Sequence, residues 1–271
     1  MRKTASILLL VSGFGLAAHA QQYAAKVTVT GGNSFVVEKL NIQGDRLFPD
    51  AGQSSSSLSM IQMIEFRFSG VGLGLCETMF RSGDRKSLEG LLNQYVSPVA
   101  QYGYLPTNLG DYLLWLLRVQ YWNGNPVGAA KTIGHIRQTK DQAFIDAASL
   151  YYAMMLLDQG KLPDAKTVFS SIGNPEGISV PMAGYIRGKI ALEEGDPRGA
   201  MQQVARIVAF HGRDPEWMAP ATVLEARIYQ RLGQPRKAAA VANELMIAYP
   251  GTQWSKLGAQ IKKESTGNAG G

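Results

Sequence analysis

Hydrophobic positions change their period along this chain, and the change predicts two differently folded parts. Between residues 25 and 68 apolar and polar side chains alternate, as in Lys26 to Thr30, which is the period of a β-strand. After this segment the apolar residues recur at steps of three and four, which is the period of an α-helix. The pattern predicts an α+β chain that is mainly helical, with a small β module at its start.

The helical part repeats one short phrase, as GNPVGA (124–129), GKLPDA (160–165), GDPRGA (195–200) and GQPRKA (233–238). Glycine stops one helix and proline or aspartate starts the next, so each phrase predicts the tight turn of a helical hairpin. Positions five, nine and twelve after each glycine fall on one helix face. They are occupied by Ala129, Ile133, Ile136; Ala165, Phe169, Ile172; Ala200, Val204, Ile207; and Ala238, Ala242, Leu245.

The turn glycines lie 36, 35 and 38 residues apart, a period typical of solenoids built from two-helix units. The pattern resembles the tetratricopeptide repeat, which has a small residue in helix A, glycine at the turn, alanine early in helix B and proline at the close. An ordinary helical bundle is the alternative. The last unit matches the repeat best, with Ala226, Tyr229, Gly233, Ala238 and the closing Tyr249-Pro250-Gly251.

A fifth, degenerate hairpin is predicted around Gly83, with Leu88, Leu92 and Tyr95 at the same three positions. It precedes Gly124 by 41 residues, so a longer connection from Pro98 to Leu109 must separate the two turns. Terminal repeats are often atypical because they cap the stack. We therefore expect a degenerate hairpin with its connection over residues 70–109 and the regular repeats over 110–264.

The β module, residues 21–69, is predicted to contain four or five short strands. Lys26 to Thr30 forms the first, Ser34 to Ile42 the second, a turn at Gly44 leads to the third, and Ile64 to Phe68 forms the last. This number of strands suggests a small, bent sheet or barrel. The segment with Leu58, Ile61 and Ile64 ahead of Glu65-Phe66 resembles small SH3-like barrels that precede tetratricopeptide repeats in exported bacterial proteins. The alternative is a β-hairpin extension packed on the first helices.

The two ends of the chain carry their own signals. Arg2 and Lys3, the apolar run from Ile7 to Leu16 and the motif Ala18-His19-Ala20 predict a secretory signal peptide, residues 1–20, cleaved after Ala20. A buried N-terminal helix is the alternative. The predicted location is therefore periplasmic or secreted. Residues 265–271, STGNAGG, are small and polar and predict a disordered tail.

Charge and cysteine content narrow the possible partners. Cleavage would remove Arg2 and Lys3 and lower the formal charge from +6 to +4. The remaining positive residues are scattered, which argues against nucleic acid as a partner. Nothing after the signal is apolar for long enough to span a membrane. Cys76 is the single cysteine, so no internal disulfide can form, and we expect it to be a buried apolar residue.

No pattern of residues predicts a cofactor, a metal or a catalytic centre. Gly70-Val71-Gly72-Leu73-Gly74 lacks the third glycine of a dinucleotide fingerprint, because Leu75 stands at that position. His135 and His211 lie in different repeats without a metal-spaced partner. We therefore expect no enzyme, although acidic residues that converge only in the folded chain would revive that alternative.

The resemblance implies that helix A lines a concave groove that grips extended peptides. Aligned on the turn glycines, the side chains predicted to face this groove are Arg118, Tyr121, Trp122, Tyr185, Lys189 and Arg227. Arginine, tyrosine and tryptophan are enriched where partners are anchored. The Lys/Asn/Arg set with which the family binds C-terminal peptides is not found at its expected positions.

The predicted function is thus a non-enzymatic scaffold that binds proteins or peptides of the cell envelope, as an adaptor or assembly factor. The edges of the β module offer a second docking surface by strand addition. Periplasmic glycan or small-ligand binding is the alternative. It is suggested by the aromatic pairs in Tyr102-Gly103-Tyr104 and Tyr121-Trp122.

Overall fold

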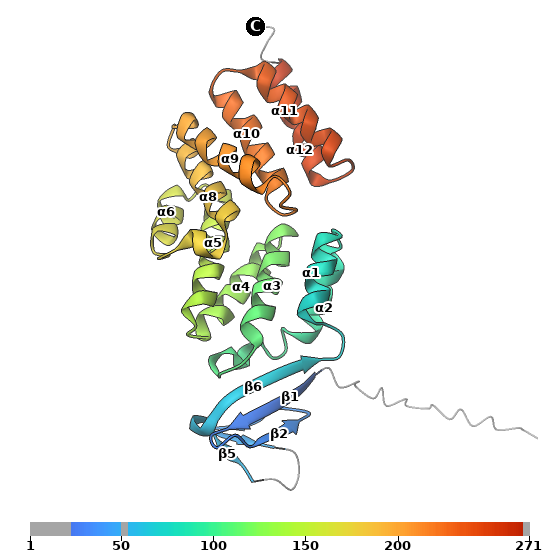
Figure 1. Ribbon diagram of the computed structural model, residues 1–271, viewed down its shortest axis with the longest axis vertical. Coiled ribbons are helices and arrows are strands. Elements are labelled where there is room, and N and C mark those ends of the chain that lie inside the picture. The colour runs from blue at the N-terminus through green and yellow to red at the C-terminus, as the bar shows by residue number, and fades with distance from the viewer. Residues whose placement is uncertain (1–22, 50–53, 268–271) are drawn as a thin grey trace, which may run out of the picture.

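The computed structural model describes residues 23–49 and 54–267 and has the predicted α+β class. Figure 1 shows an elongated molecule with the β module at one end and helices over the rest of its length. The predicted signal peptide, residues 1–20, lies outside the described residues. No helix among the described residues is long and apolar enough to cross a membrane.

The β module contains two antiparallel sheets of three strands each. The first sheet has the order β2-β1-β6 and the second β3-β4-β5. Its strands are β1 (Tyr23–Val29), β2 (Ser34–Val37), β3 (Asn41–Gln43), β4 (Arg46–Phe48), β5 (Ser56–Ser57) and β6 (Ile61–Phe68). The alternation along β1 places Ala25 and Val27 in the core, where neither side chain is exposed to solvent.

The single strand predicted from Ser34 to Ile42 is wrong, because the chain bends after Val37 and passes into the second sheet. Leu40 sits at the bend with its side chain buried. Its backbone N–H donates to the Tyr23 hydroxyl at 3.2 Å, and its carbonyl accepts from the Tyr102 hydroxyl at 3.4 Å. These side chains replace the ladder hydrogen bonds that a continuous strand would have made.

The β module is fixed to the helices along β6. The Asn108 side chain accepts from the backbone N–H of Phe66 at 2.8 Å and donates to its carbonyl at 3.0 Å. At the exit of β6 a side chain on Gly70 would collide with the ring of Tyr95, so this glycine permits close packing. Cys76 is fully buried in the first helix, and burial raises the pKa of its thiol to about 11.

The helices form hairpins at the predicted places. The degenerate hairpin is α1 (Leu73–Arg81) and α2 (Arg85–Tyr95), and the 3₁₀ segment η2 (Ala100–Tyr104) lies in its connection. The regular hairpins are α3 (Leu109–Trp122) with α4 (Pro126–Gln138), α5 (Gln142–Asp158) with α6 (Leu162–Ser170), α8 (Val180–Glu193) with α9 (Pro197–His211), and α10 (Met218–Arg231) with α11 (Pro235–Ala248). The short α7 (Pro175–Ile178) precedes α8, and α12 (Gln253–Gly267) follows α11.

The recurring phrase has the conformation that its glycine predicts. All five turn glycines have positive φ, between 68° and 85°, a region that side chains rarely permit. The alanines five residues later, Ala129, Ala165, Ala200 and Ala238, have no solvent exposure. Each one lets the second helix of its hairpin lie close to the first. The recurring phrase therefore marks the place where the two helices of each hairpin pack closely.

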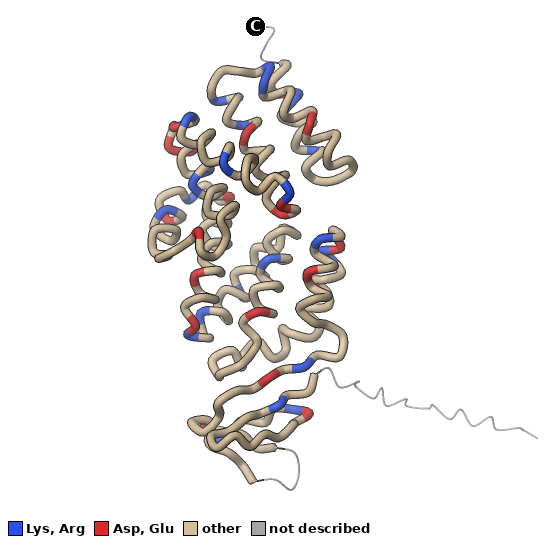
Figure 2. The backbone as a smooth tube through the Cα atoms, in the orientation of Figure 1, with Lys and Arg blue, Asp and Glu red and all other residues tan. Residues whose placement is uncertain are grey.

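Successive hairpins pack on one another, and the stack curls toward one side. The ring of Trp122 at the end of α3 lies 5.7 Å from that of Trp254 at the start of α12. Two helices so far apart in the sequence meet only if the face between them is concave. Figure 2 shows positive and negative residues interspersed along the helices, without a block of one sign.

The C-terminal helix continues past the predicted start of the tail at Ser265. Ser265 is buried, and its hydroxyl donates to the Ile261 carbonyl at 2.8 Å and accepts from the Gln230 side chain at 3.0 Å. The contact with Gln230 of α10 holds the last turn of α12, which ends at Gly267. Residues 268–271 of the predicted tail lie outside the described part of the chain.

Candidate functional site

A single carboxylate on the concave face gathers side chains from two hairpins. Glu216 lies in the loop between α9 and α10 and accepts from Arg118 Nη2, with which it forms an ion pair. Its other oxygen accepts from Trp122 Nε1 at 2.6 Å and from the Tyr151 hydroxyl at 3.1 Å. We call Arg118, Trp122 and Tyr151 the carboxylate cradle.

Local structure explains how the cradle forms. Arg118 and Trp122 are one helical turn apart on α3, so both side chains project from the same face. Tyr151 comes from α5 of the next hairpin. The loop that carries Glu216 is shaped by Asp214, whose Oδ1 accepts from the backbone N–H groups of Glu216 and Trp217, both at 2.9 Å. This turn directs Glu216 toward α3.

The charges of the cradle are largely withdrawn from water. The side chain of Glu216 is 6% exposed and that of Arg118 is 28% exposed. Burial alone would lower the pKa of Arg118, but the Tyr151 phenol and the Glu216 carboxylate hold it above its ordinary value. Burial, reinforced by the charge of Glu216, raises the pKa of Tyr151 well above its ordinary value, which keeps this phenol a donor.

Aromatic rings surround the cradle. The ring of Trp122 lies 4.9 Å from that of Tyr121 and 5.5 Å from that of Trp217. The Arg118 guanidinium sits between two rings, 4.1 Å from the centre of Phe80 and 4.5 Å from that of Trp115. Cation–π contacts of this kind stabilise a partly desolvated guanidinium. The rings also fix the orientation in which Arg118 meets a carboxylate.

A second junction lies beside the first, at Asp158 near the end of α5. Its carboxylate accepts from the Tyr121 hydroxyl at 2.9 Å and from Lys189 Nζ at 2.5 Å. Burial would lower the pKa of Lys189, but Tyr185 and Asp158 raise it above its ordinary value, so this lysine stays charged. The Asp158 junction thus connects α3, α5 and α8.

The six predicted groove residues do not form one surface. Arg118 and Trp122 belong to the cradle, Tyr121 and Lys189 meet at Asp158, and the ring of Tyr185 packs 5.6 Å from that of Trp217. Arg227 lies apart from these five. It pairs with Glu264 of α12, the helix that follows its hairpin, so it contributes to helix packing there.

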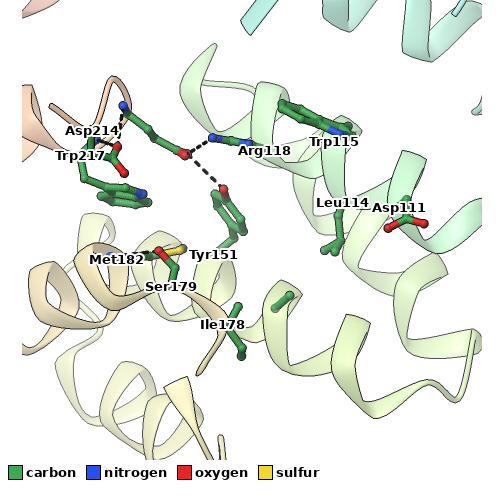
Figure 3. A pocket seen from close by; sticks show the side chains of 12 residues that line it. Asp111, Leu114, Trp115, Arg118, Tyr151, Ile178, Ser179, Met182, Asp214 and Trp217 are labelled. Carbon is green, nitrogen blue, oxygen red and sulfur yellow. Dashed lines mark hydrogen bonds and ion pairs between the residues drawn. The ribbon is translucent and has the colours of Figure 1, made fainter. Parts of the chain in front are cut away.

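A cavity of about 380 Å³ opens beside the cradle. Figure 3 shows Arg118, Trp115 and Leu114 on its α3 wall, with Tyr151, Ile178 and Met182 on other walls. The dashed lines from Arg118 and Tyr151 converge on one carboxylate, that of Glu216. A volume of this size lies within the range of small-molecule and side-chain pockets.

Three acidic residues line the cavity: Asp111, Asp214 and Glu216. Glu216 is engaged by the cradle, and one oxygen of Asp214 is engaged by two backbone N–H groups. In this conformation both serve as acceptors that shape the site. Among the described residues no group of three or more His, Cys, Asp or Glu side chains is arranged to hold a metal ion.

Sequence reasoning missed Glu216, Tyr151 and Asp158. Tyr151 could have been found, because it stands nine residues before its turn glycine, the position that Trp115 occupies in the preceding hairpin. Glu216 gave no such signal. It belongs to a connection between hairpins and meets Arg118 across 98 residues of sequence, so no repeat position encodes the contact.

Comparison with known proteins adds no family assignment: no protein-family model matches the chain, and no curated protein sequence is significantly similar to it. The functional argument therefore depends on the side chains described above.

Proposed function

We propose that this chain is an exported scaffold of the tetratricopeptide type that binds another protein of the cell envelope, as an adaptor or assembly factor. The observation that carries the proposal is the cluster in which Arg118, Trp122 and Tyr151 meet Glu216, next to a cavity of about 380 Å³. Stacked hairpins bury one face against their neighbours and leave an extended inner surface for a partner.

The composition of this face supports a protein partner. Arginine, tyrosine and tryptophan are enriched among the residues that contribute most to binding at protein interfaces, and each combines a large contact area with a polar end. Here they meet next to apolar side chains such as Leu114, Ile178 and Met182, which line the cavity. A side chain of a partner can be desolvated there while its backbone remains at the open rim. Absence of catalytic activity remains a prediction.

Photo-crosslinking from the cavity tests the proposal. A photoreactive residue is placed at Ile178, which lines the cavity and is 38% exposed, and in a control at Val127, which is 81% exposed and lies outside its lining. We expect a discrete adduct with one envelope protein from position 178 and none from 127. Replacing Trp115 by alanine should abolish the adduct, because this ring forms a wall of the cavity.

The captured protein is then purified and its dissociation constant measured with the wild-type chain and with Trp115→Ala. Adducts of equal yield from both positions, or a purified candidate that binds both chains equally, would contradict the proposal. Folding of each variant is checked by circular dichroism. Absence of any adduct from a folded, exported chain would contradict it as well.

A second candidate is a periplasmic glycan or small ligand, favoured by the aromatic wall at Trp115 and the acidic residues of the cavity. The Tyr102 ring offers less support, because it stacks on Phe66 of the β module, 6.4 Å away. All four tryptophans of the chain lie at this site. Trp115 and Trp217 line the cavity, Trp122 belongs to the cradle, and the ring of Trp254 contacts that of Trp122. Titration of tryptophan emission with cell-wall fragments therefore reports on this site alone.

A further inference from the structure

Glu216 is held as a bound ligand would be held. Its carboxylate comes from the loop that connects two later hairpins, and all its side-chain partners, Arg118, Trp122 and Tyr151, belong to α3 and α5. An ionised acceptor with three donors, one of them a guanidinium, is a strong hydrogen-bonding arrangement. The helices thus supply a complete set of donors for a carboxylate, and the loop supplies the carboxylate.

The donor side carries more positive charge than Glu216 neutralises. A second guanidinium, that of Arg85 on α2, lies 5.5 Å from the ring centre of Trp122 and 4.6 Å from that of Phe80. No ion pair involves Arg85 among the described residues. The Nε atoms of both Arg85 and Arg118 are buried without a hydrogen-bond partner. Buried donors without an acceptor are costly, so this cluster favours an additional anionic group.

The Glu216 side chain can rotate out of the cradle while its loop stays anchored by Trp217, which is 2% exposed and packs 5.5 Å from the ring of Trp122. The loop comprises the six residues between the end of α9 at His211 and the start of α10 at Met218. Gly212, Arg213 and Pro215 in this loop are exposed. The turn at Asp214 holds the backbone of Glu216 and Trp217, whereas the cradle is formed by helices. Removing Glu216 would therefore leave Arg118, Trp122 and Tyr151 in place.

We propose that the carboxylate cradle, with Arg85 beside it, is the binding site for a carboxylate of the partner protein, and that Glu216 occupies it as a placeholder until the partner arrives. This inference rests on the proposed scaffold function. An acidic side chain and a C-terminal carboxylate present the same chemistry to the cradle. The adjoining cavity receives the neighbouring apolar atoms of the partner against Leu114, Ile178 and Met182.

Competition with Glu216 has a measurable consequence. A ligand that needs the vacant cradle binds with an affinity reduced by the fraction of time for which the cradle is vacant. If the cradle is vacant for about one hundredth of the time, removing the charge of Glu216 strengthens binding by up to about a hundredfold. The neutral variant Glu216→Gln keeps the size of the side chain but forms only weaker, uncharged hydrogen bonds there.

The experiment uses the chain without its signal peptide and follows tryptophan emission during peptide titrations. The probes are Ac-Ala-Ala-Glu-Ala-Ala-NH₂, its glutamine counterpart, and Ac-Ala-Ala-Ala-Ala with a free C-terminal carboxylate. They are added to the wild-type chain, to Glu216→Gln, and to the double variant Glu216→Gln with Arg118→Gln. The double variant removes both charges together, so it leaves no buried charge unpaired. Should Glu216→Gln fail to fold, Glu216→Asp withdraws the carboxylate by one methylene instead.

We expect at least one of the two acidic probes to bind Glu216→Gln up to about a hundredfold more tightly than the wild-type chain, and the double variant not at all. Preference for one of these probes identifies the source of the carboxylate, and the glutamine peptide should not bind. Equal binding to the wild-type chain and Glu216→Gln, binding that survives loss of Arg118, or no binding up to the solubility limit would overturn the proposal. Binding of glucuronate in place of both peptides would overturn it as well.

If the cradle does not bind a carboxylate, the proposed scaffold function can still be tested separately. If the adduct from position 178 persists unchanged in the double variant, the chain binds a partner protein without using the cradle. If neither peptides nor a partner bind to the folded chain, both proposals fall.

Discussion

Arg118 and Arg227 stand at the same repeat position, six residues before a turn glycine, yet the fold uses them differently. Each pairs with a glutamate far along the chain, Arg118 with Glu216 and Arg227 with Glu264. The first carboxylate is 6% exposed and comes from a loop, whereas the second is 39% exposed and comes from a helix. Rings enclose Arg118, while Arg227 shares its glutamate with Gln230.

The difference shows what a repeat position determines. It directs an arginine toward the neighbouring element, because the helices of each hairpin have the same orientation to the next. The element that lies next to the arginine then decides what its side chain contacts. Where the next element is a packed helix, the arginine becomes part of the packing. Where a loop crosses the concave face, the arginine becomes part of a cradle that can exchange its carboxylate.

Matched substitutions at the two arginines should give the largest difference in stability. Arg118→Gln leaves Glu216 buried without its cation, which we expect to lower the free energy of unfolding by about 3–5 kcal/mol. Arg227→Gln removes an exposed ion pair and should cost about 0–1 kcal/mol. Urea unfolding of the two variants measures both effects.

Equal losses for Arg118→Gln and Arg227→Gln would show that the two ion pairs have the same weight. The distinction between a cradle and a packing contact would then have no energetic basis. As a control, the dependence of the unfolding free energy on urea concentration should be unchanged in both variants. A changed slope would mean that the substitution alters the unfolded chain.

The two neutral donors of the cradle should have intermediate effects. Trp122→Phe and Tyr151→Phe each remove one hydrogen bond to the Glu216 carboxylate and keep a ring, at a cost of about 1.5–3 kcal/mol. Because both donate to the same oxygen, their effects should not add in the double variant. The control is Trp254→Phe, which changes a ring that touches Trp122 but has no hydrogen bond to Glu216. An equal loss from Trp254→Phe would attribute the effect to packing.

The hairpins could be predicted from the sequence because local rules determine them. Glycine at a turn permits a positive φ, and an alanine five residues later permits close packing, so each phrase describes its own structure. The small β module was predictable for the same reason. Its division into two sheets was not, because the bend at Leu40 depends on hydroxyl groups of Tyr23 and Tyr102 from distant segments.

The candidate site was half predictable. Five of its side chains were predicted from their repeat positions, namely Arg118, Tyr121, Trp122, Tyr185 and Lys189. Arg227 was predicted on the same grounds, but it pairs with Glu264 at a different place in the molecule. Glu216 could not be inferred, since its contact with Arg118 depends on the curvature of the whole stack. That curvature sums small rotations between hairpins, which no single residue encodes.

High salt should distinguish the two ion pairs, although its effect on stability is smaller than that of the substitutions above. At about 1 M salt the screening length falls to about 3 Å, so exposed charges contribute little while buried ones are screened much less. The cost of Arg227→Gln should therefore vanish in high salt, and most of the cost of Arg118→Gln should persist. Urea titrations at low and high salt measure the difference. Loss of both effects in salt would mean that water reaches Glu216 freely.

Acid should remove the contribution of Glu264, the smallest effect in this comparison. Hydrogen bonds from Gln260 and Arg227 hold the pKa of Glu264 below its ordinary value of 4.5. The folded chain therefore binds this proton less readily than the unfolded chain, and the stabilisation is complete above the unfolded pKa and is lost as the pH falls through the folded one. The difference in unfolding free energy between the wild-type chain and Glu264→Gln should be constant near neutral pH and shrink below about pH 4.5. A difference that stays constant into acid would mean that Glu264 contributes through its shape and not its charge, and the contrast with the cradle would then rest on burial alone.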